Sequence, residues 1–188
     1  MKKNAIIITW TGYEDHELVY PYFRLLGAGF NVSIIGDQKD AKNRIYGKFG
    51  IHMPCHLLLK DFYNKTETFH NENDLLIIPG GVNALEKLRQ ESGVKEFVKK
   101  WDFDKKVIGS ICSAAQLLIS SKITKGRKIT GYYSLEDDIK NSGAEYTKQN
   151  VVIDDNIVSS PHYNFMGEWM ESVLEVYKKK MDSHKNKI

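Results

Sequence analysis

Cysteine and proline are scarce in this chain, and long apolar runs are missing. The 188 residues include two cysteines, Cys55 and Cys112, and four prolines. Two cysteines cannot build the disulfide framework of a small secreted domain, so we expect reduced thiols in a cytoplasmic protein. The apolar segment that follows residues 1–4 is only five residues long, which is too short for a signal peptide or a membrane-spanning helix.

A strong charge of either sign is also absent. Lysine and arginine total 27 and aspartate and glutamate total 24, which gives a net charge of +3, and the two signs are interspersed. Only the tail from about residue 178 to Lys187 is markedly basic, and we interpret it as a solvated helix end. We therefore expect no nucleic-acid partner and no membrane partner. A hydrophobic content of 41% indicates one domain, residues 1–188, with a full core.

Strand-like and helix-like segments alternate in the first two thirds of the chain. Short apolar runs predict buried strands at residues 5–8, 31–35, 74–78 and 107–111. Helix-forming runs predict helices at residues 15–26, 84–100 and 114–121, the first capped by Asp15 and bent at Pro21. The irregular segment 44–59 predicts an antiparallel excursion at a sheet edge.

The last third continues this alternation. We expect a short strand at 126–130, a helix at 134–143 capped by Ser134 and ended by Gly143, and a hairpin with strands 151–153 and 157–159. The final helix starts near Asn164 and turns apolar side chains inward, namely Phe165, Trp169, Val173 and Val176. The whole pattern predicts an α/β fold with a mostly parallel sheet and helices on both faces.

Cys112 stands where the strand 107–111 passes into a helix. The positive end of a helix dipole lowers the pKa of a thiol, so this position favours a reactive cysteine. The alternative is a buried, inert cysteine. In parallel sheets, sites lie at the carboxyl ends of the strands, and Gly80, Gly81, Cys112 and His162 all follow predicted strands there.

Several segments, in their order and spacing, are similar to the ThiJ/PfpI superfamily over nearly the whole chain. They are residues 17–25, 47–50, 78–81, 110–112, 125–128, 137–139, 143–145 and 158–160. The resemblance implies the flavodoxin-like three-layer sandwich that this superfamily shares with class I glutamine amidotransferases. The PfpI branch is most similar; its members are intracellular cysteine peptidases, glyoxalases or deglycases. The resemblance also implies a homodimer or a higher homo-oligomer.

The resemblance implies roles for five residues of the site. Cys112 would be the nucleophile in a strained elbow, and Glu17 would hydrogen-bond its sulfur. The amides of Gly80 or Gly81 and of Ser113 would form an oxyanion hole. The residues alone also permit plainer interpretations, in which Glu17 complements a helix dipole and the glycines form a tight turn.

The chain departs from the PfpI branch next to the nucleophile. Ser113 replaces the usual histidine, and a serine is no general base near neutral pH. Glu86 matches a carboxylate that reaches in from a neighbouring subunit, or is a plain surface residue. His162 is either a replacement base or an exposed loop histidine. Glutamine amidotransferases place a catalytic histidine after a comparable strand, but their following glutamate is Asn164 here.

Two further groups of polar residues lie near these segments. His52, Cys55 and His56 lack zinc spacing and a fourth ligand, so we expect no metal, and nothing in the sequence calls for a cofactor. Residues 13–16, which are Tyr13, Glu14, Asp15 and His16, border the expected pocket.

Three hypotheses follow. The first is a cysteine-dependent enzyme that acts on a small electrophilic carbonyl compound or a modified protein, as a glyoxalase, deglycase or hydrolase. The second is a redox or stress protein whose Cys112 is oxidised, without catalysis. The third is a cysteine peptidase or amidase, which Ser113 disfavours.

Overall fold

A seven-stranded sheet forms the centre of the computed structural model, which describes residues 3–185. Its strands are β1 (Lys3–Ile8), β2 (Phe30–Gly36), β5 (Leu57–Leu58), β6 (Leu75–Ile78), β7 (Val107–Ile111), β10 (Val152–Asp154) and β11 (Ile157–Ser160). They lie side by side in the order β10-β11-β7-β6-β1-β2-β5. All neighbours are parallel except β10 and β11, which form the expected antiparallel hairpin.

The central strands are apolar because both faces of the sheet are covered. Every residue of β6 and β7 is buried, as are the last four residues of β1. A parallel sheet between two layers of helices requires such unbroken apolar runs. The strands predicted at residues 5–8, 31–35, 74–78 and 107–111 are therefore confirmed.

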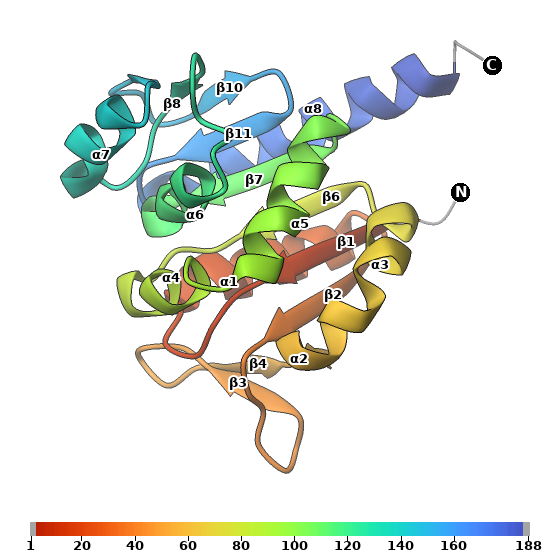
Figure 1. Ribbon diagram of the computed structural model, residues 1–188. Helices are drawn as coiled ribbons and strands as arrows, with labels where there is room; N and C mark the ends of the chain where they lie inside the picture. Colours follow the sequence, from red (N-terminus) through yellow and green to blue (C-terminus); the bar gives the residue numbers. More distant parts are fainter. Residues whose placement is uncertain (1–2, 186–188) are drawn as a thin grey trace.

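Helices cover both faces of the sheet. The helices α1 (Asp15–Gly27) and α8 (Met166–Lys185) contact each other behind it, whereas α3 (Thr66–Glu72), α5 (Ser92–Phe103) and α6 (Ala115–Ser120) lie in front (Figure 1). Shorter helices are α2 (Leu59–Phe62), α4 (Val82–Leu88) and α7 (Glu136–Asn141). This arrangement is the flavodoxin-like three-layer sandwich expected from the resemblance.

Two small sheets flank the main one. The segment 44–59 contains the antiparallel pair β3 (Arg44–Tyr46) and β4 (His52–Pro54), which confirms the edge excursion. The strand expected at 126–130 is present as β8 (Lys128–Ile129), which pairs with β9 (Glu145–Tyr146).

The single helix expected at residues 84–100 is wrong. The chain instead forms α4 and α5, with a break between Leu88 and Ser92. The helix is interrupted at Glu91, whose backbone is extended with ψ of 108° and whose carboxylate accepts a hydrogen bond of 2.6 Å from the hydroxyl of Tyr63. This contact joins residues 28 apart in the chain, so helical periodicity does not reveal it.

Two predicted helix caps are also wrong. Asp15 is the first residue of α1 and not its cap, and its carboxylate accepts hydrogen bonds from the amides of Phe49 and Ile51 at 2.9 and 2.8 Å. Ser134 lies in a 3-10 turn (Tyr133–Leu135) before α7 and makes no capping hydrogen bond. Gly143 does adopt the expected left-handed conformation, with φ of +85°.

The helix ends bear on two further expectations. The helix α1 continues through Pro21 to Gly27. The helix α8 follows a 3-10 turn (Tyr163–Phe165) and buries Trp169, Val173 and Val176 as expected, whereas Phe165 is half-buried. The end of the predicted basic tail, residues 186–188, lies outside the described residues. Within residues 3–185, no helix has both the length and the apolar character needed to cross a membrane.

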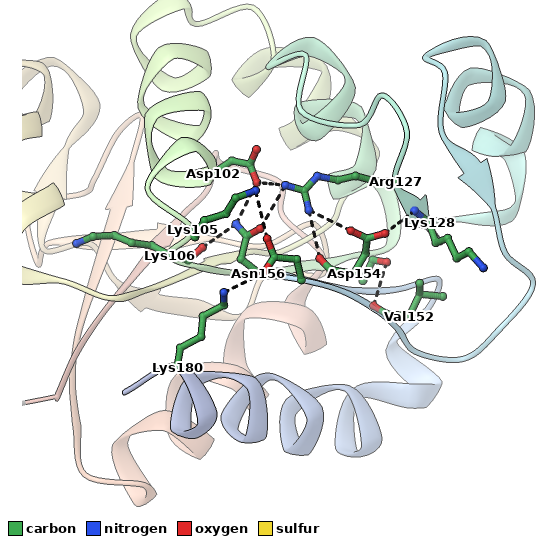
Figure 2. Close-up of polar contacts among 11 residues, drawn as sticks. Asp102, Lys105, Lys106, Arg127, Lys128, Val152, Asp154, Asn156 and Lys180 are labelled. Atoms are coloured by element: carbon green, nitrogen blue, oxygen red, sulfur yellow. Dashed lines mark hydrogen bonds and ion pairs between the residues drawn. The ribbon is translucent and has the colours of Figure 1, made fainter. Parts of the chain in front are cut away.

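A network of hydrogen bonds and ion pairs connects β8 and the hairpin β10–β11 to α5 (Figure 2). Arg127, just before β8, donates to the carboxylate of Asp102 on α5, to Asp154 at 3.2 Å and to Asn156 at 3.3 Å. Asn156 also donates to Asp102 at 3.0 Å. Because the side chains of Arg127 and Asp102 are only 12% and 14% exposed, this network fixes the hairpin β10–β11 from which His162 follows.

Arg127→Met is expected to destabilise the fold by about 3 kcal/mol, because it leaves the largely buried carboxylate of Asp102 without its cation. For a chain of this size, that loss corresponds to a decrease in the melting temperature of about 10 °C. Thermal unfolding followed by circular dichroism measures it. The neighbouring Lys128→Met is the control, since that exposed side chain makes only a 3.8 Å pair with Glu145. Equal melting temperatures for the two variants would contradict the role of the network.

Candidate functional site

Cys112 occupies a strained turn between β7 and α6. Its φ is +59°, a left-handed value that is unusual for a residue with a side chain. The strand β7 ends at Ile111, and a 3-10 turn (Cys112–Ala114) leads into α6. This geometry corresponds to the expected nucleophile elbow, which holds a reactive side chain at the carboxyl edge of a sheet.

Glu17 lies in the first turns of α1 and is completely buried. Its Oε2 accepts a hydrogen bond of 2.9 Å from the amide of Gly80, which follows β6. A Cβ on Gly80 would lie 2.7 Å from the Cβ of Cys112 and would overlap Glu17 Oε2. The absence of a side chain at residue 80 therefore allows Glu17 and Cys112 to approach each other from different elements.

Glu17 and Cys112 titrate as a coupled pair. Burial, and next the negative charge of Glu14, raise the pKa of Glu17 to about 8. Burial, and next the charge of Glu17, raise the pKa of the Cys112 thiol to about 12. The carboxyl group of Glu17 therefore loses its proton first, near pH 8, while Cys112 remains a neutral thiol, so the pair carries one negative charge.

The lowered thiol pKa expected at the start of a helix is wrong for the folded protein. The helix α6 has only six residues, and desolvation of the sulfur outweighs its dipole. The amide and the hydroxyl of Ser113 interact with the sulfur and lower the pKa of Cys112, but they do not offset the burial.

The two glycines after β6 have different surroundings. The amide of Gly80 donates to Glu17, which assigns it to the carboxyl group and not to an oxyanion. Gly81 has φ of +105° and lines the pocket beside Cys112. A Cβ at Gly81 would lie 2.6 Å from the amide nitrogen of Glu14, so only glycine fits there. The amides of Gly81 and Ser113 are the remaining candidates for an oxyanion hole.

Cys112 opens into a pocket of about 360 Å³ between α4, α6 and the loops after β8 and β11. The volume is at the lower end of the range for small-molecule sites. The lining residues include Glu14, Lys48, Gly81, Val82, Cys112, Ser113, Gln116, Tyr132, Leu135, His162 and Tyr163. The structure therefore brings Cys112, Gly81, Ser113 and His162 together around one small cavity, with Glu17 buried behind the sulfur.

Lys48 is a pocket residue to which the sequence analysis gave no role. It forms an ion pair with the buried carboxylate of Glu14, which also accepts from His16 at 3.0 Å. The positive charge of Lys48 helps to lower the pKa of Glu17. The glycines at residues 47 and 50 are the signal in the sequence, because they mark the tight loop that carries Lys48 to the pocket.

Asp15 and Tyr13 hold that loop in place. The amides of Phe49 and Ile51 in this loop donate to Asp15, as described above. In addition, the hydroxyl of Tyr13 donates a hydrogen bond of 2.9 Å to the carbonyl of Ile51. The amide of Lys48 donates to the carbonyl of Tyr13, also at 2.9 Å. Of the four residues expected to border the pocket, Glu14 lines it, while Tyr13 and Asp15 are fully buried supports.

His162 lines the pocket but is oriented by its own loop. Its Nδ1 accepts a hydrogen bond of 3.2 Å from the amide of Asn164, so the neutral ring carries its proton on Nε2. The ring lies 3.9 Å from that of Tyr163 and stacks on Tyr132 at 6.3 Å. The Nε2–H group can therefore donate a hydrogen bond to a molecule in the pocket.

The other expected residues lie elsewhere. Glu86 is exposed on α4 and does not line the pocket, so its suggested role in a second copy stays a prediction. Cys55 is buried, and His56 accepts a hydrogen bond of 3.0 Å from the amide of Ile34. In the part of the chain that the structure describes, no group of three or more His, Cys, Asp or Glu side chains is arranged to hold a metal ion.

Comparisons with known proteins identify the family of the chain. The sequence model of the DJ-1/PfpI family matches residues 2–176. Deglycase PfpI of Pyrococcus furiosus is 36% identical over 166 residues, which are 88% of this chain and 94% of that protein. General stress protein 18 of Bacillus subtilis is 33% identical over 160 residues, with 85% and 88% covered.

A solved structure gives the same fold. DJ-1 of Schizosaccharomyces pombe superposes with a TM-score of 0.83 over 96% of this chain and 97% of its own, at 20% identity. The family match over nearly the whole chain and the close relative in Pyrococcus furiosus lead to one conclusion: the chain belongs to the DJ-1/PfpI family.

Proposed function

We propose that this chain is a cysteine-dependent enzyme that acts on small electrophilic carbonyl compounds or their protein adducts, as a deglycase or glyoxalase. The observation that carries the proposal is the strained Cys112 with the buried, hydrogen-bonded Glu17 behind it. A pocket of about 360 Å³ admits a short carbonyl compound. The name of the Pyrococcus furiosus relative, a deglycase, supports the reaction class.

The first chemical step is addition of the sulfur to the carbonyl carbon. In the singly ionised pair, the Glu17 carboxylate accepts the thiol proton while the sulfur–carbon bond forms and the carbonyl π bond opens. The amides of Gly81 and Ser113 and the Nε2–H of His162 surround the developing oxyanion, and Glu17 returns the proton to it. The product of this step is a hemithioacetal.

A 2-oxoaldehyde needs no external oxidant for the rest of the reaction. With methylglyoxal, the aldehyde carbon of the hemithioacetal is oxidised to a thioester while the neighbouring ketone carbon is reduced to an alcohol. Water then cleaves the thioester, releasing lactate and the thiol. Glu17 suits the proton transfers of this sequence, because its pKa of about 8 lies close to neutral pH.

Assembly belongs to the same proposal. A homodimer or a higher homo-oligomer would place a second copy near the mouth of the pocket, where Val82 is 57% exposed and Tyr163 is 37% exposed. Glu86 would then contribute only from the second copy, because its side chain lies outside the pocket of its own chain.

A peptidase is less compatible with the site. Ser113 follows the nucleophile in place of a histidine, and its hydroxyl and amide interact with the sulfur. His162 uses Nδ1 to accept from Asn164, which leaves a donor and not a base on the side of the pocket. The site therefore supports peptidase or amidase activity less well than it supports the reaction with carbonyl compounds.

Oxidation of Cys112 is the second candidate function. The sulfur is only partly buried, so a small oxidant can reach it. The relative named general stress protein 18 is consistent with a stress-related role.

Cys112→Ser is expected to lower the turnover of methylglyoxal by about a thousandfold or more, because serine is a far weaker nucleophile than a thiolate. Single-turnover loss of methylglyoxal and formation of lactate measure it. The control is Cys55→Ser, which removes the other, buried cysteine and keeps a donor for the carbonyl of Leu57. Full activity of the Cys112 variant would exclude the proposed nucleophile.

The alkylation rate of Cys112 is expected to be low near neutral pH and to keep rising at alkaline pH, because burial and the charge of Glu17 raise the pKa of the thiol to about 12. Glu17→Gln removes the negative charge beside the sulfur and keeps an acceptor for the Gly80 amide, so the pKa of the thiol should fall and alkylation should become faster at a given alkaline pH. The rate of reaction with iodoacetamide, followed by mass spectrometry over the neutral to alkaline range, tests this. An unchanged pH profile would show that the charge of Glu17 does not act on the sulfur.

The same variant has an expected effect on stability. Glu17 stays protonated in the folded state up to about pH 8, but its unfolded value is 4.5, so the folded state binds more protons between these values. Stability therefore falls as the pH rises through this window. Glu17→Gln should remove this fall. The free energy of unfolding of the variant relative to the wild type should therefore be greater at pH 8 than at pH 4.5, by on the order of a few kcal/mol. Denaturant unfolding at both pH values measures the difference.

Mild peroxide treatment separates the second candidate function from the first. If the chain is a redox protein, the intact mass should increase by two oxygen atoms in the wild type but not in Cys112→Ser. The Cys55→Ser variant should behave as the wild type. Oxidation of Cys112 together with an absence of carbonyl turnover would favour the redox function, whereas turnover by the reduced protein would favour the enzyme.

A further inference from the structure

Gln116 is a polar side chain of the pocket to which the proposed reaction assigns no role. It is only 6% exposed, and it lines the pocket that contains Cys112. Its Oε1 is buried, with no hydrogen-bond partner among the residues that the structure describes. A buried amide oxygen without a partner costs about 1–3 kcal/mol, so its position in a pocket wall points to a group that binds there.

Its place in the helix directs Gln116 toward the reacting atoms. It is the second residue of α6, the helix that follows the Cys112 turn, and both residues line the same pocket. Ser113, which lies between them in the sequence, also lines the pocket, and its Oγ is buried without a hydrogen-bond partner. Ser113 already interacts with the sulfur of Cys112. Gln116 is the next polar side chain along this segment that lines the pocket, so it can bind a part of the substrate away from the sulfur.

The pocket lining leaves the amide oxygen of Gln116 unpaired. Val82 and Leu135, which line the same pocket, have apolar side chains. None of the polar side chains of the lining donates a hydrogen bond to Oε1 of Gln116; they are Glu14, Lys48, Ser113, Tyr132, Ser134, His162 and Tyr163. A substrate atom in the pocket can therefore complete the hydrogen bonding of Gln116.

The amide also limits the chemistry of that atom. A carboxamide presents one acceptor and one donor, and a rotation of its plane exchanges them. A hydroxyl group both donates and accepts, so it pairs with either orientation, whereas a methyl group pairs with neither. The cavity of about 360 Å³ leaves room for only a short chain between the sulfur and this amide.

We propose that Gln116 determines substrate specificity by binding a hydroxyl group on the far side of the 2-oxo group from the reacting aldehyde, so that the preferred substrates are short hydroxylated carbonyl compounds. This inference rests on the proposed function, because Cys112 must add to the carbonyl of the same molecule. The hydroxyl makes no covalent bond; it forms a hydrogen bond to Gln116 that an unhydroxylated analogue lacks. A site built to bind a hydroxyl rejects such an analogue strongly, because the amide is then left unpaired.

Two 2-oxoaldehydes that differ in one hydroxyl group test the proposal. Methylglyoxal and its hydroxylated counterpart, 3-hydroxy-2-oxopropanal, are compared by kcat/KM in the full chain. We expect the wild type to prefer the hydroxylated compound by about tenfold to a hundredfold. Gln116→Met, which keeps the length of the side chain and removes the amide, should reduce this ratio to near one.

The control is Gln90→Met, the same chemical change on an exposed residue that bonds only to the carbonyl of Glu86. It should keep the ratio of the wild type. If Gln116→Met does not fold, as judged by its melting temperature, Gln116→Asn withdraws the amide by one methylene and serves the same comparison. A loss of discrimination in either folded variant supports the proposal, since a merely structural role would lower both activities together.

Two results would overturn the inference. A wild type that turns over methylglyoxal without preferring the hydroxylated compound, or a ratio that is the same in the wild type and the folded Gln116 variants, excludes Gln116 as the discriminating residue and leaves the proposed function standing. Turnover of neither compound by the wild type, or turnover that survives in Cys112→Ser, defeats the proposed function itself and the inference with it.

Discussion

The close approach of the Gly80 backbone to Glu17 and Cys112 is the constraint on which the site depends. Three elements meet there: the loop after β6, the first turns of α1 and the end of β7. The amide of Gly80 donates to Glu17 at 2.9 Å, and any side chain at residue 80 would displace either the carboxyl group or the sulfur. The adjacent strands β6 and β7 are parallel and fully buried, so their carboxyl ends are fixed in register. This register holds Gly80 close to Cys112.

Burial at this point explains the electrostatics of the pair. Desolvation is the first cause of the raised pKa of both Glu17 and Cys112, so neither group ionises easily alone. Sharing one negative charge avoids placing two in the same dry space. The buried Glu14 and its ion-pair partner, the exposed Lys48, act on Glu17 in opposite directions, since Glu14 raises and Lys48 lowers its pKa.

Much of the fold could be predicted from the sequence, because apolar runs and turn residues act locally. The central strands, the hairpin and the Cys112 elbow follow from such patterns, and Glu17 followed only from the family resemblance. The break between α4 and α5 lies at Glu91, whose carboxylate accepts a hydrogen bond from Tyr63, and the carboxylate of Asp15 bonds to amides more than 30 residues away. Contacts of this range leave no periodic signal. The raised thiol pKa was missed for the same reason, since burial depends on the assembled structure.

Gln116 illustrates the same limit within the site. Its spacing of four residues from Cys112 was visible in the sequence, but helical spacing alone does not distinguish a pocket wall from the core. What distinguishes them is that its amide is buried without a partner, a property of the folded chain. Oxidation and carbonyl addition both require the sulfur of Cys112, so that atom does not discriminate between the two proposed functions. The buried amide of Gln116 favours a pocket that orients a substrate over one that only protects an oxidisable thiol.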